Sequence, residues 1–219
     1  MPDLDTDETW NLTLRAIRAF LDADVVLPIL SLPVIASPLN IAVNLYGGEF
    51  LMEMLSDPES ALHDLEIITD LQCRLHTICR EMVPAGQLQC TCSDGRAQPP
   101  GYGQLCGCTT QLLSGLLYEE MIAPFDERLL SVYPNGGMIH LCGAHTQHLE
   151  TFRKMKSLRS IQINDRASWD LQEYFDQLRE DQIIYFCPCD ELTLEQAMEI
   201  TNGHRMVLVG QMDEPVRRK

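Results

Sequence analysis

The sequence lacks the short motifs that mark the common nucleotide-binding and hydrolase folds. It has no Gly-x-Gly-x-x-Gly after a strand and no Walker loop, so a nucleotide site is not indicated. It has no Gly-x-Ser-x-Gly turn, which argues against an α/β-hydrolase with a serine nucleophile. Function must therefore be inferred from charge, cysteine spacing and strand patterns.

Long apolar runs and positive charge are also scarce. No apolar run approaches the ~20 residues that a membrane-spanning helix needs. The formal net charge is −16, from 32 acidic and 16 basic residues. Such a surface repels nucleic acids and anionic membranes, so we expect neither as a partner and expect a small-molecule substrate. The acidic N-terminal residues do not resemble a secretory signal, and we expect a cytoplasmic protein.

Cysteine, in contrast, is abundant. Nine cysteines occur in 219 residues, and six of them form the pairs 90/92, 106/108 and 187/189, with one residue between the two thiols. Disulfides are rare in the cytoplasm, so metal binding or buried thiols are favoured. On a strand, both thiols of such a pair would lie on one face. The spacing differs from the Cys-x-x-Cys of zinc ribbons, which argues against a small zinc-finger module.

Apolar residues at helical spacing predict three helices in the first part of the chain. They cover 8–21, 56–82 and 116–132. Ser56 and Glu59 would form a capping box at the start of the second helix, and Pro124 should break the third. His63 and His76 lie on the second helix and are expected at its surface.

Continuous apolar runs predict strands. In the first part of the chain they cover 25–30, 87–92 and 104–109. Further strands begin near residues 137, 158, 182 and 206, with a helix pattern in each interval; the last helix has a Thr193-x-x-Gln196 capping box. Apolar strands alternating with helices predict one α/β domain over 1–219, with a parallel sheet covered by helices. Units of this length suit a (β/α)8 barrel or an open doubly wound sheet.

The C-terminal ends of these strands are where barrel sites lie. His140 and Cys142 would project from one face of a strand end and could hold two positions around zinc. Cys187 or Cys189 would supply a third ligand, leaving the fourth position open. The alternatives are a His-x-Cys that only packs in the core and, at 187–189, a loop with two unreactive thiols.

Other polar residues follow the same strand ends. Gln162 and Asn164 are candidate substrate-binding residues, although Asn164 could also cap the next helix. Gly210 and Gln211 occupy the end of the last strand. His145 could orient a ligand or act as an acid–base group, and for His148 we expect a surface position at a helix start. Gln162 and Asn164 thus join the metal ligands in one candidate site.

Three segments carry a family resemblance: 37–48 with the SDPES helix start, 113–125, and 137–143 continued by 207–213. Together they resemble the uroporphyrinogen decarboxylase superfamily, which includes zinc-dependent methyltransferases that serve methylcobamide and coenzyme M. The resemblance implies a (β/α)8 TIM-type barrel, of which this chain would hold about strands 3 or 4 to 7, truncated at both ends. It also implies a pocket at the C-terminal mouth of the barrel.

The resemblance further implies site residues. Asn44 aligns with a tyrosine of the decarboxylases and Cys108 with about their serine, which makes both implied substrate-binding positions. These substitutions, and the absence of the family's arginine, aspartate and late histidine, argue against porphyrinogen decarboxylation. His140-x-Cys142 matches the zinc motif of the methyltransferases. Their third ligand would fall beyond Lys219 unless Cys187 or Cys189 replaces it.

The function implied in this way is zinc-thiol-dependent methyl transfer from a corrinoid-type donor, with a corrinoid protein as a possible partner. The alternatives are metal-free decarboxylation of a uroporphyrinogen-like tetrapyrrole in porphyrin biosynthesis, and a non-catalytic remnant that binds a ligand or another chain. A partial barrel exposes two sheet edges. We therefore expect a homodimer or association with the missing half of the barrel.

Overall fold

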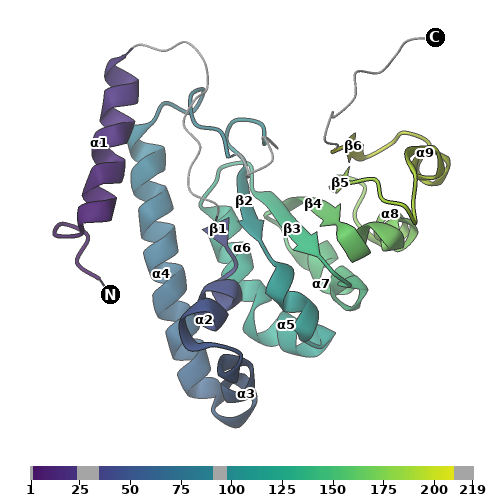
Figure 1. The fold of residues 1–219 in the computed structure, drawn as a ribbon, viewed down its shortest axis with the longest axis horizontal. Helices are drawn as coiled ribbons and strands as arrows, with labels where there is room; N and C mark the ends of the chain where they lie inside the picture. Colours follow the sequence, from purple (N-terminus) through teal and green to yellow (C-terminus); the bar gives the residue numbers. More distant parts are fainter. Residues whose placement is uncertain (1, 24–34, 91–97, 210–219) are drawn as a thin grey trace.

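A parallel sheet with helices in its connections organises the protein in a computed structural model, which describes residues 2–23, 35–90 and 98–209 (Figure 1). The strands are β1 (Ile35–Ala36), β2 (Gly103–Cys106), β3 (Gly137–Cys142), β4 (Leu158–Asn164), β5 (Ile183–Phe186) and β6 (Met206–Leu208). The α-helices are α1 (Glu8–Asp22), α2 (Pro38–Tyr46), α3 (Glu49–Ser56), α4 (Pro58–Met82), α5 (Gly115–Met121), α6 (Ala123–Ser131), α7 (Leu149–Lys154), α8 (Leu171–Gln177) and α9 (Leu194–Thr201). Three short 3-10 helices are η1 (Cys108–Leu112), η2 (Thr146–His148) and η3 (Asp165–Asp170).

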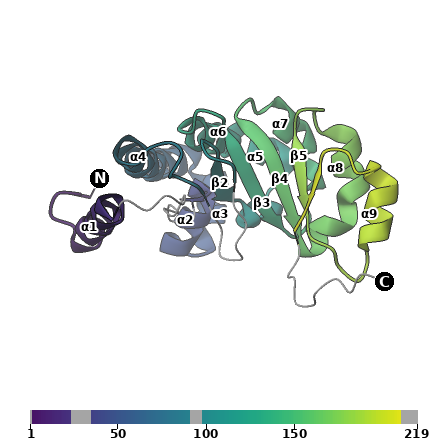
Figure 2. The same cartoon turned by 90° about the horizontal axis from the view of Figure 1, so that it is seen from above.

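The six strands lie in chain order, from β1 to β6, and every neighbouring pair is parallel. Parallel neighbours need crossover connections, which the helices between the strands supply. Figures 1 and 2 show the elements passing across the molecule from α1 and α4 at one end to α9 at the other. The α/β prediction with a parallel sheet is confirmed. Within the described residues the sheet runs from β1 to β6 as its two ends, so closure into a barrel stays a prediction.

The two faces of the sheet differ in chemistry, because successive side chains of a strand point to opposite faces. One face carries fully buried apolar residues: Leu105, Ile139, Leu141, Ile161, Ile163, Ile184 and Phe186. They belong to the main core, together with residues of the helices α6, α7 and α8. The other face carries polar and sulfur-bearing residues: Gln104, Cys106, Met138, His140, Cys142, Ser160, Gln162, Asn164 and Tyr185. The candidate site lies on this second face.

Most helix predictions are confirmed, with two corrections. The third predicted helix breaks into α5 and α6 before Pro124, as expected, because proline lacks the amide hydrogen that a continuous helix requires. The Ser56–Glu59 capping box is wrong. Ser56 is the last residue of α3, and Asp57 caps α4 by accepting from the Ser60 amide. His76 is also misplaced, because it is buried and its Nδ1 lies 2.9 Å from the Tyr133 hydroxyl.

Two of the strands predicted in the first part of the chain need correction. The segment 87–90 is a turn followed by a single bridge residue, Leu88, because the Gln87 amide donates to the Pro84 carbonyl and closes a turn. The predicted strand over 104–109 ends at Cys106, and the chain then enters η1. The predicted strand over 25–30, Cys92, Gly210 and Gln211 lie outside the described residues.

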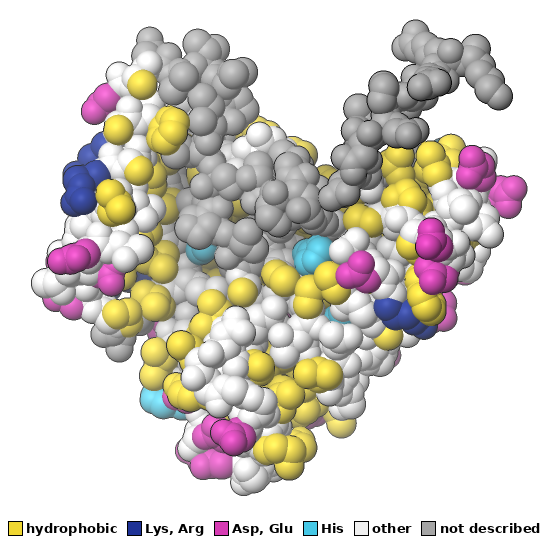
Figure 3. All heavy atoms as spheres, viewed as in Figure 1, with side chains coloured by type: hydrophobic (Ala, Val, Ile, Leu, Met, Phe, Trp, Pro, Cys, Tyr) yellow, Lys and Arg dark blue, Asp and Glu magenta, His cyan; other side chains and the backbone are white. Residues whose placement is uncertain are grey.

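The surface agrees with the acidic composition. On the face shown in Figure 3, acidic side chains appear over several helices and basic side chains are sparse. In the part of the chain that the structure describes, no helix combines the length and the apolar character needed to cross a membrane.

Candidate functional site

The site is built where β2 and β3 end beside each other. Their register places Cys106 directly opposite His140, so both residues reach the same edge of the sheet. Cys142 follows two residues later on β3 and points to the same face as His140. The Cys106–Gly107–Cys108 turn then brings a third thiol to this edge at the start of η1. All four residues are half-buried.

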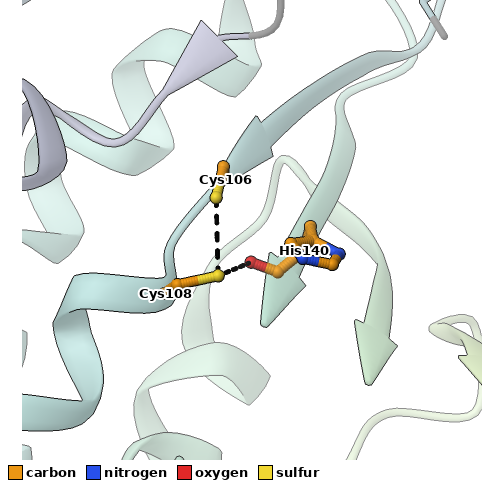
Figure 4. Close-up of side chains that lie close together, drawn as sticks. All are labelled: Cys106, Cys108 and His140. Atoms are coloured by element: carbon orange, nitrogen blue, oxygen red, sulfur yellow. Dashed lines mark hydrogen bonds between the residues drawn. The ribbon is translucent and has the colours of Figure 1, made fainter. Parts of the chain in front are cut away.

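The sulfur and nitrogen atoms of this cluster lie close together. The Sγ atoms of Cys106 and Cys108 are 3.5 Å apart, and Cys108 Sγ lies 4.0 Å from the backbone oxygen of His140 (Figure 4). Ligand atoms of Cys106, Cys108 and His140 all lie within 4.8 Å of one another. Cys142 joins them through its Sγ, 3.2 Å from His140 Nε2. We call these four residues the thiol cluster.

Gln162 on β4 fixes the orientation of the His140 ring. Its Oε1 lies 2.9 Å from His140 Nδ1, and its Nε2 donates to Cys187 Sγ at 3.5 Å. The amide oxygen accepts from Nδ1–H, which leaves Nε2 turned toward Cys142. Gln162 is fully buried, so this contact is shielded from water. Such a hydrogen bond is what commonly selects the tautomer of a metal-binding histidine.

The thiols of the cluster share protons unequally. The hydrogen bond with Cys108 lowers the pKa of Cys106 to about 6, despite partial burial. Hydrogen bonds from Cys108 and His140 lower the pKa of Cys142 to about 4. Hydrogen bonds with Cys106 and Cys142 raise the pKa of Cys108, and burial adds to this rise. Burial opposes protonation of His140, but its hydrogen bonds with Cys142 and Gln162 outweigh burial and raise its pKa. The cluster therefore favours thiolates at Cys106 and Cys142 and a protonated thiol at Cys108.

Two polar residues outside the cluster hold it in place. Asn40, in the first turn of α2, points its Nδ2 at Cys106 Sγ at 3.7 Å and accepts from the Thr109 amide through Oδ1 at 3.2 Å. Asn164 donates to Cys142 Sγ at 3.8 Å, which places one predicted substrate-binding residue against the cluster. Asn40 was missed from the sequence, because nothing in its local pattern sets it apart from Asn44.

The remaining predicted residues lie at different distances from the cluster. Asn44 is exposed, one turn further along α2, and its substrate role stays a prediction. Cys187 follows β5, and its Sγ accepts a hydrogen bond from Gln162, which itself contacts His140 of the cluster. Cys189 Sγ lies 4.0 Å from the Leu192 carbonyl oxygen. The set of ligand atoms that the structure brings together thus uses Cys106 and Cys108, and the ligand role of Cys187 stays a prediction.

The two histidines after β3 are buried behind the site. His145 donates through Nδ1 to the Gly143 carbonyl at 3.2 Å, and burial lowers its pKa. The surface position expected for His148 is wrong. Its Nε2 donates to the Thr110 carbonyl at 2.9 Å, and its ring packs 4.4 Å from that of Tyr118. The turn through η2 directs this ring inward, and burial lowers its pKa to about 4.

The thiol cluster fits a thiophilic metal ion in its donor chemistry. Three sulfurs and one imidazole nitrogen are the donors of Cys₃His zinc sites. Zinc–sulfur bonds of 2.3 Å in a tetrahedron place sulfurs about 3.8 Å apart, close to the 3.5 Å between Cys106 and Cys108. Because His140 Nδ1 is held by Gln162, Nε2 is the nitrogen available to a metal. The cluster is therefore compatible with zinc.

Comparison with known proteins adds no family to this picture. No protein-family model matches the chain, and no curated protein matches its sequence. The function proposed for this protein therefore depends on the chemistry of the thiol cluster.

Proposed function

We propose that this protein is a zinc-dependent thiol alkyltransferase whose metal is held by Cys106, Cys108 and His140. The observation that supports this proposal is the convergence of these ligand atoms within 4.8 Å at the end of a parallel sheet. Bound zinc would supply Lewis acidity, which keeps a coordinated thiol deprotonated and nucleophilic at neutral pH. Three protein ligands with one exchangeable position are typical of catalytic zinc.

Cys142 would be the fourth donor to the metal, and an incoming substrate thiol would take its place. It lies outside the compact group of three, and its Sγ hydrogen-bonds with His140 and Asn164 as well as with Cys108. Asn164 can hold the displaced Cys142 thiolate by hydrogen bonding, and Gln162 keeps His140 in place throughout. Asn40 fixes the Cys106 side of the group.

The alkyl group in this proposal is methyl, and the donor is a methyl corrinoid, delivered free or by a corrinoid protein. The substrate thiolate attacks the methyl carbon, a sulfur–carbon bond forms and the carbon–cobalt bond breaks, with its electron pair remaining on cobalt. The resemblance to the methyltransferases supports this choice, together with the lowered pKa of the Cys142 thiol in the cluster. Barrel closure around the site belongs to the same proposal.

The first test is the zinc content of the purified chain, measured by elemental analysis. We expect about one zinc per chain, retained in Cys189→Ser, whose thiol lies outside the cluster, and lost in Cys108→Ser. Circular dichroism confirms that each variant is folded. A folded wild-type chain that takes up no zinc would overturn the proposal.

The second test is transfer itself. The zinc-loaded chain is incubated with methylcobalamin and 2-mercaptoethanesulfonate, and the methyl thioether is measured by mass spectrometry. We expect zinc-dependent thioether formation that Cys108→Ser abolishes. Stoichiometric zinc without thioether formation above the protein-free rate would retain the metal site and overturn the transferase.

A further inference from the structure

The Cys106–Gly107–Cys108 turn places two half-buried thiols 3.5 Å apart with one residue between them. Cys106 and Cys108 are each other's neighbours along the chain, whereas Cys142, which also hydrogen-bonds with Cys108, is held on another strand by His140 and Asn164. A disulfide bond is about 2.05 Å long, so the two sulfurs need to approach by only about 1.5 Å. This turn is therefore arranged for a local disulfide.

The backbone of the turn is anchored on both sides. The Gly107 amide donates to the His140 carbonyl at 2.9 Å, which continues the β2–β3 pairing past the end of the strand. A Cβ at position 107 would lie 3.0 Å from Ile139 Cγ2, so glycine lets the turn lie close against β3. Asn40 contacts Cys106 Sγ, at the first residue of the turn, and the Thr109 amide, one residue beyond its last. These contacts hold the backbone of the turn in place with the two thiols beside each other.

We propose that the Cys106–Gly107–Cys108 turn is a redox modification site, at which a peroxide converts the two thiols into an intramolecular disulfide. One thiolate attacks a peroxide oxygen, the O–O bond breaks, and a sulfenic acid and water form. The second thiol then attacks the sulfenic sulfur, the S–S bond forms and a second water leaves. In total, two thiols and one hydrogen peroxide give one disulfide and two waters.

The consequence for metal binding rests on the proposed function. Because Cys106 and Cys108 are two of the three proposed ligands, the disulfide removes both thiolates and releases zinc. Zinc bound beforehand, in turn, shields the thiolates and slows their oxidation. Oxidation of the turn and retention of the metal are then mutually exclusive states of one site.

Trypsin separates the relevant cysteines, which makes the test direct. Cleavage after Arg96 and Arg128 gives the peptide 97–128, which contains Cys106 and Cys108 as its only cysteines, and 129–153 contains Cys142 alone. The chelator-treated full chain is exposed to hydrogen peroxide, its remaining thiols are alkylated with iodoacetamide, and the peptides are analysed by mass spectrometry.

We expect peptide 97–128 to lose two hydrogen atoms and to resist alkylation, both in the wild type and in Cys142→Ser. Cys106→Ser should abolish this product. A cross-link between 97–128 and 129–153, or oxidation to sulfinic acid without a disulfide, would overturn the redox inference. Circular dichroism confirms that the wild type and each variant are folded before oxidation.

A parallel arm uses zinc-loaded protein and a chromophoric chelator that reports released zinc. We expect zinc to slow disulfide formation at least tenfold, and each disulfide formed to release one zinc. A disulfide in the metal-free chain that zinc does not slow would support the redox inference and contradict the proposed ligand role of these two cysteines. The two proposals therefore fail separately.

Discussion

A buried carboxyl group on α6 gives the protein a predictable dependence of stability on pH. Asp126 is fully buried, and the Tyr118 hydroxyl donates to its Oδ2 at 3.0 Å. Burial raises the pKa of Asp126 from 3.8 to about 7, against the opposing effect of the Ser37 and Tyr118 hydroxyls. The folded protein therefore keeps this proton at pH values where the unfolded chain has lost it.

The sign and the size follow from proton linkage. Between about pH 4 and pH 7 the unfolded state binds fewer protons than the folded state, so the free energy of unfolding falls as pH rises. A pKa raised by about three corresponds to on the order of 4 kcal/mol, at about 1.4 kcal/mol for each pKa unit. This destabilisation is complete above about pH 7 and absent below about pH 4.

The test is Asp126→Asn, which keeps the shape of the side chain and removes its titration. The amide oxygen can accept from Tyr118, and the amide nitrogen can donate to the Ser37 hydroxyl. Urea unfolding followed by circular dichroism at several pH values between 4 and 8 should show the variant gaining stability over the wild type as pH rises. The exposed Asp190→Asn should show no such gain. Parallel stability curves for the wild type and Asp126→Asn would refute the reasoning.

Two further predictions concern the site and a helix end. Gln162→Leu removes the hydrogen bond to His140 Nδ1 and should weaken zinc binding about 10- to 100-fold, measured by competition with a chromophoric chelator. Gln162→Glu keeps the acceptor and should largely restore affinity; equal affinities in all three proteins would contradict the role of Gln162. Thr193→Ala breaks the capping box with Gln196 and should cost about 1 kcal/mol in urea unfolding, whereas Thr193→Ser should cost little. An unchanged unfolding midpoint in Thr193→Ala would show that the box does not stabilise α9.

The sequence predicts the repeating second half of the chain well, because each unit carries its own local signals. Glycine or a polar turn precedes each strand, the strands from 137 onward are rich in apolar residues, and the capping box at Thr193 with Asn202 in the left-handed region limits α9. The pairing of His140 and Cys142 follows from strand periodicity alone, since residues i and i+2 share a face. These predictions need no knowledge of distant contacts.

The composition of the site could not be predicted in the same way, because it depends on contacts between distant segments. The apolar run predicts a strand at Cys108, yet this residue lies past the end of β2 in η1 and faces Cys106. Asn40 reaches the site across 66 residues of sequence, and only the position of α2 against β2 shows it. His148 has the local pattern of a surface residue, but the turn through η2 buries it against Tyr118. In each case the tertiary fold overrides the local pattern.

The division of the sheet into two faces explains why the thiols gather where they do. On the apolar face, side chains such as Ile139 and Leu141 are fully buried in the core, where an unpaired charged group would be unfavourable. The residues that alternate with them on β3, His140 and Cys142, must therefore lie on the opposite face. On that face the thiolates that the cluster favours are stabilised by Gln162 and Asn164 of β4 acting through His140 and Cys142. A substitution on the apolar face should therefore lower the stability of the fold, whereas an equally buried substitution on the polar face should lower metal affinity. Ile161 and Gln162 are neighbours on one strand and point to opposite faces. Comparing Ile161→Ala with Gln162→Leu in unfolding and in zinc binding therefore separates the two effects.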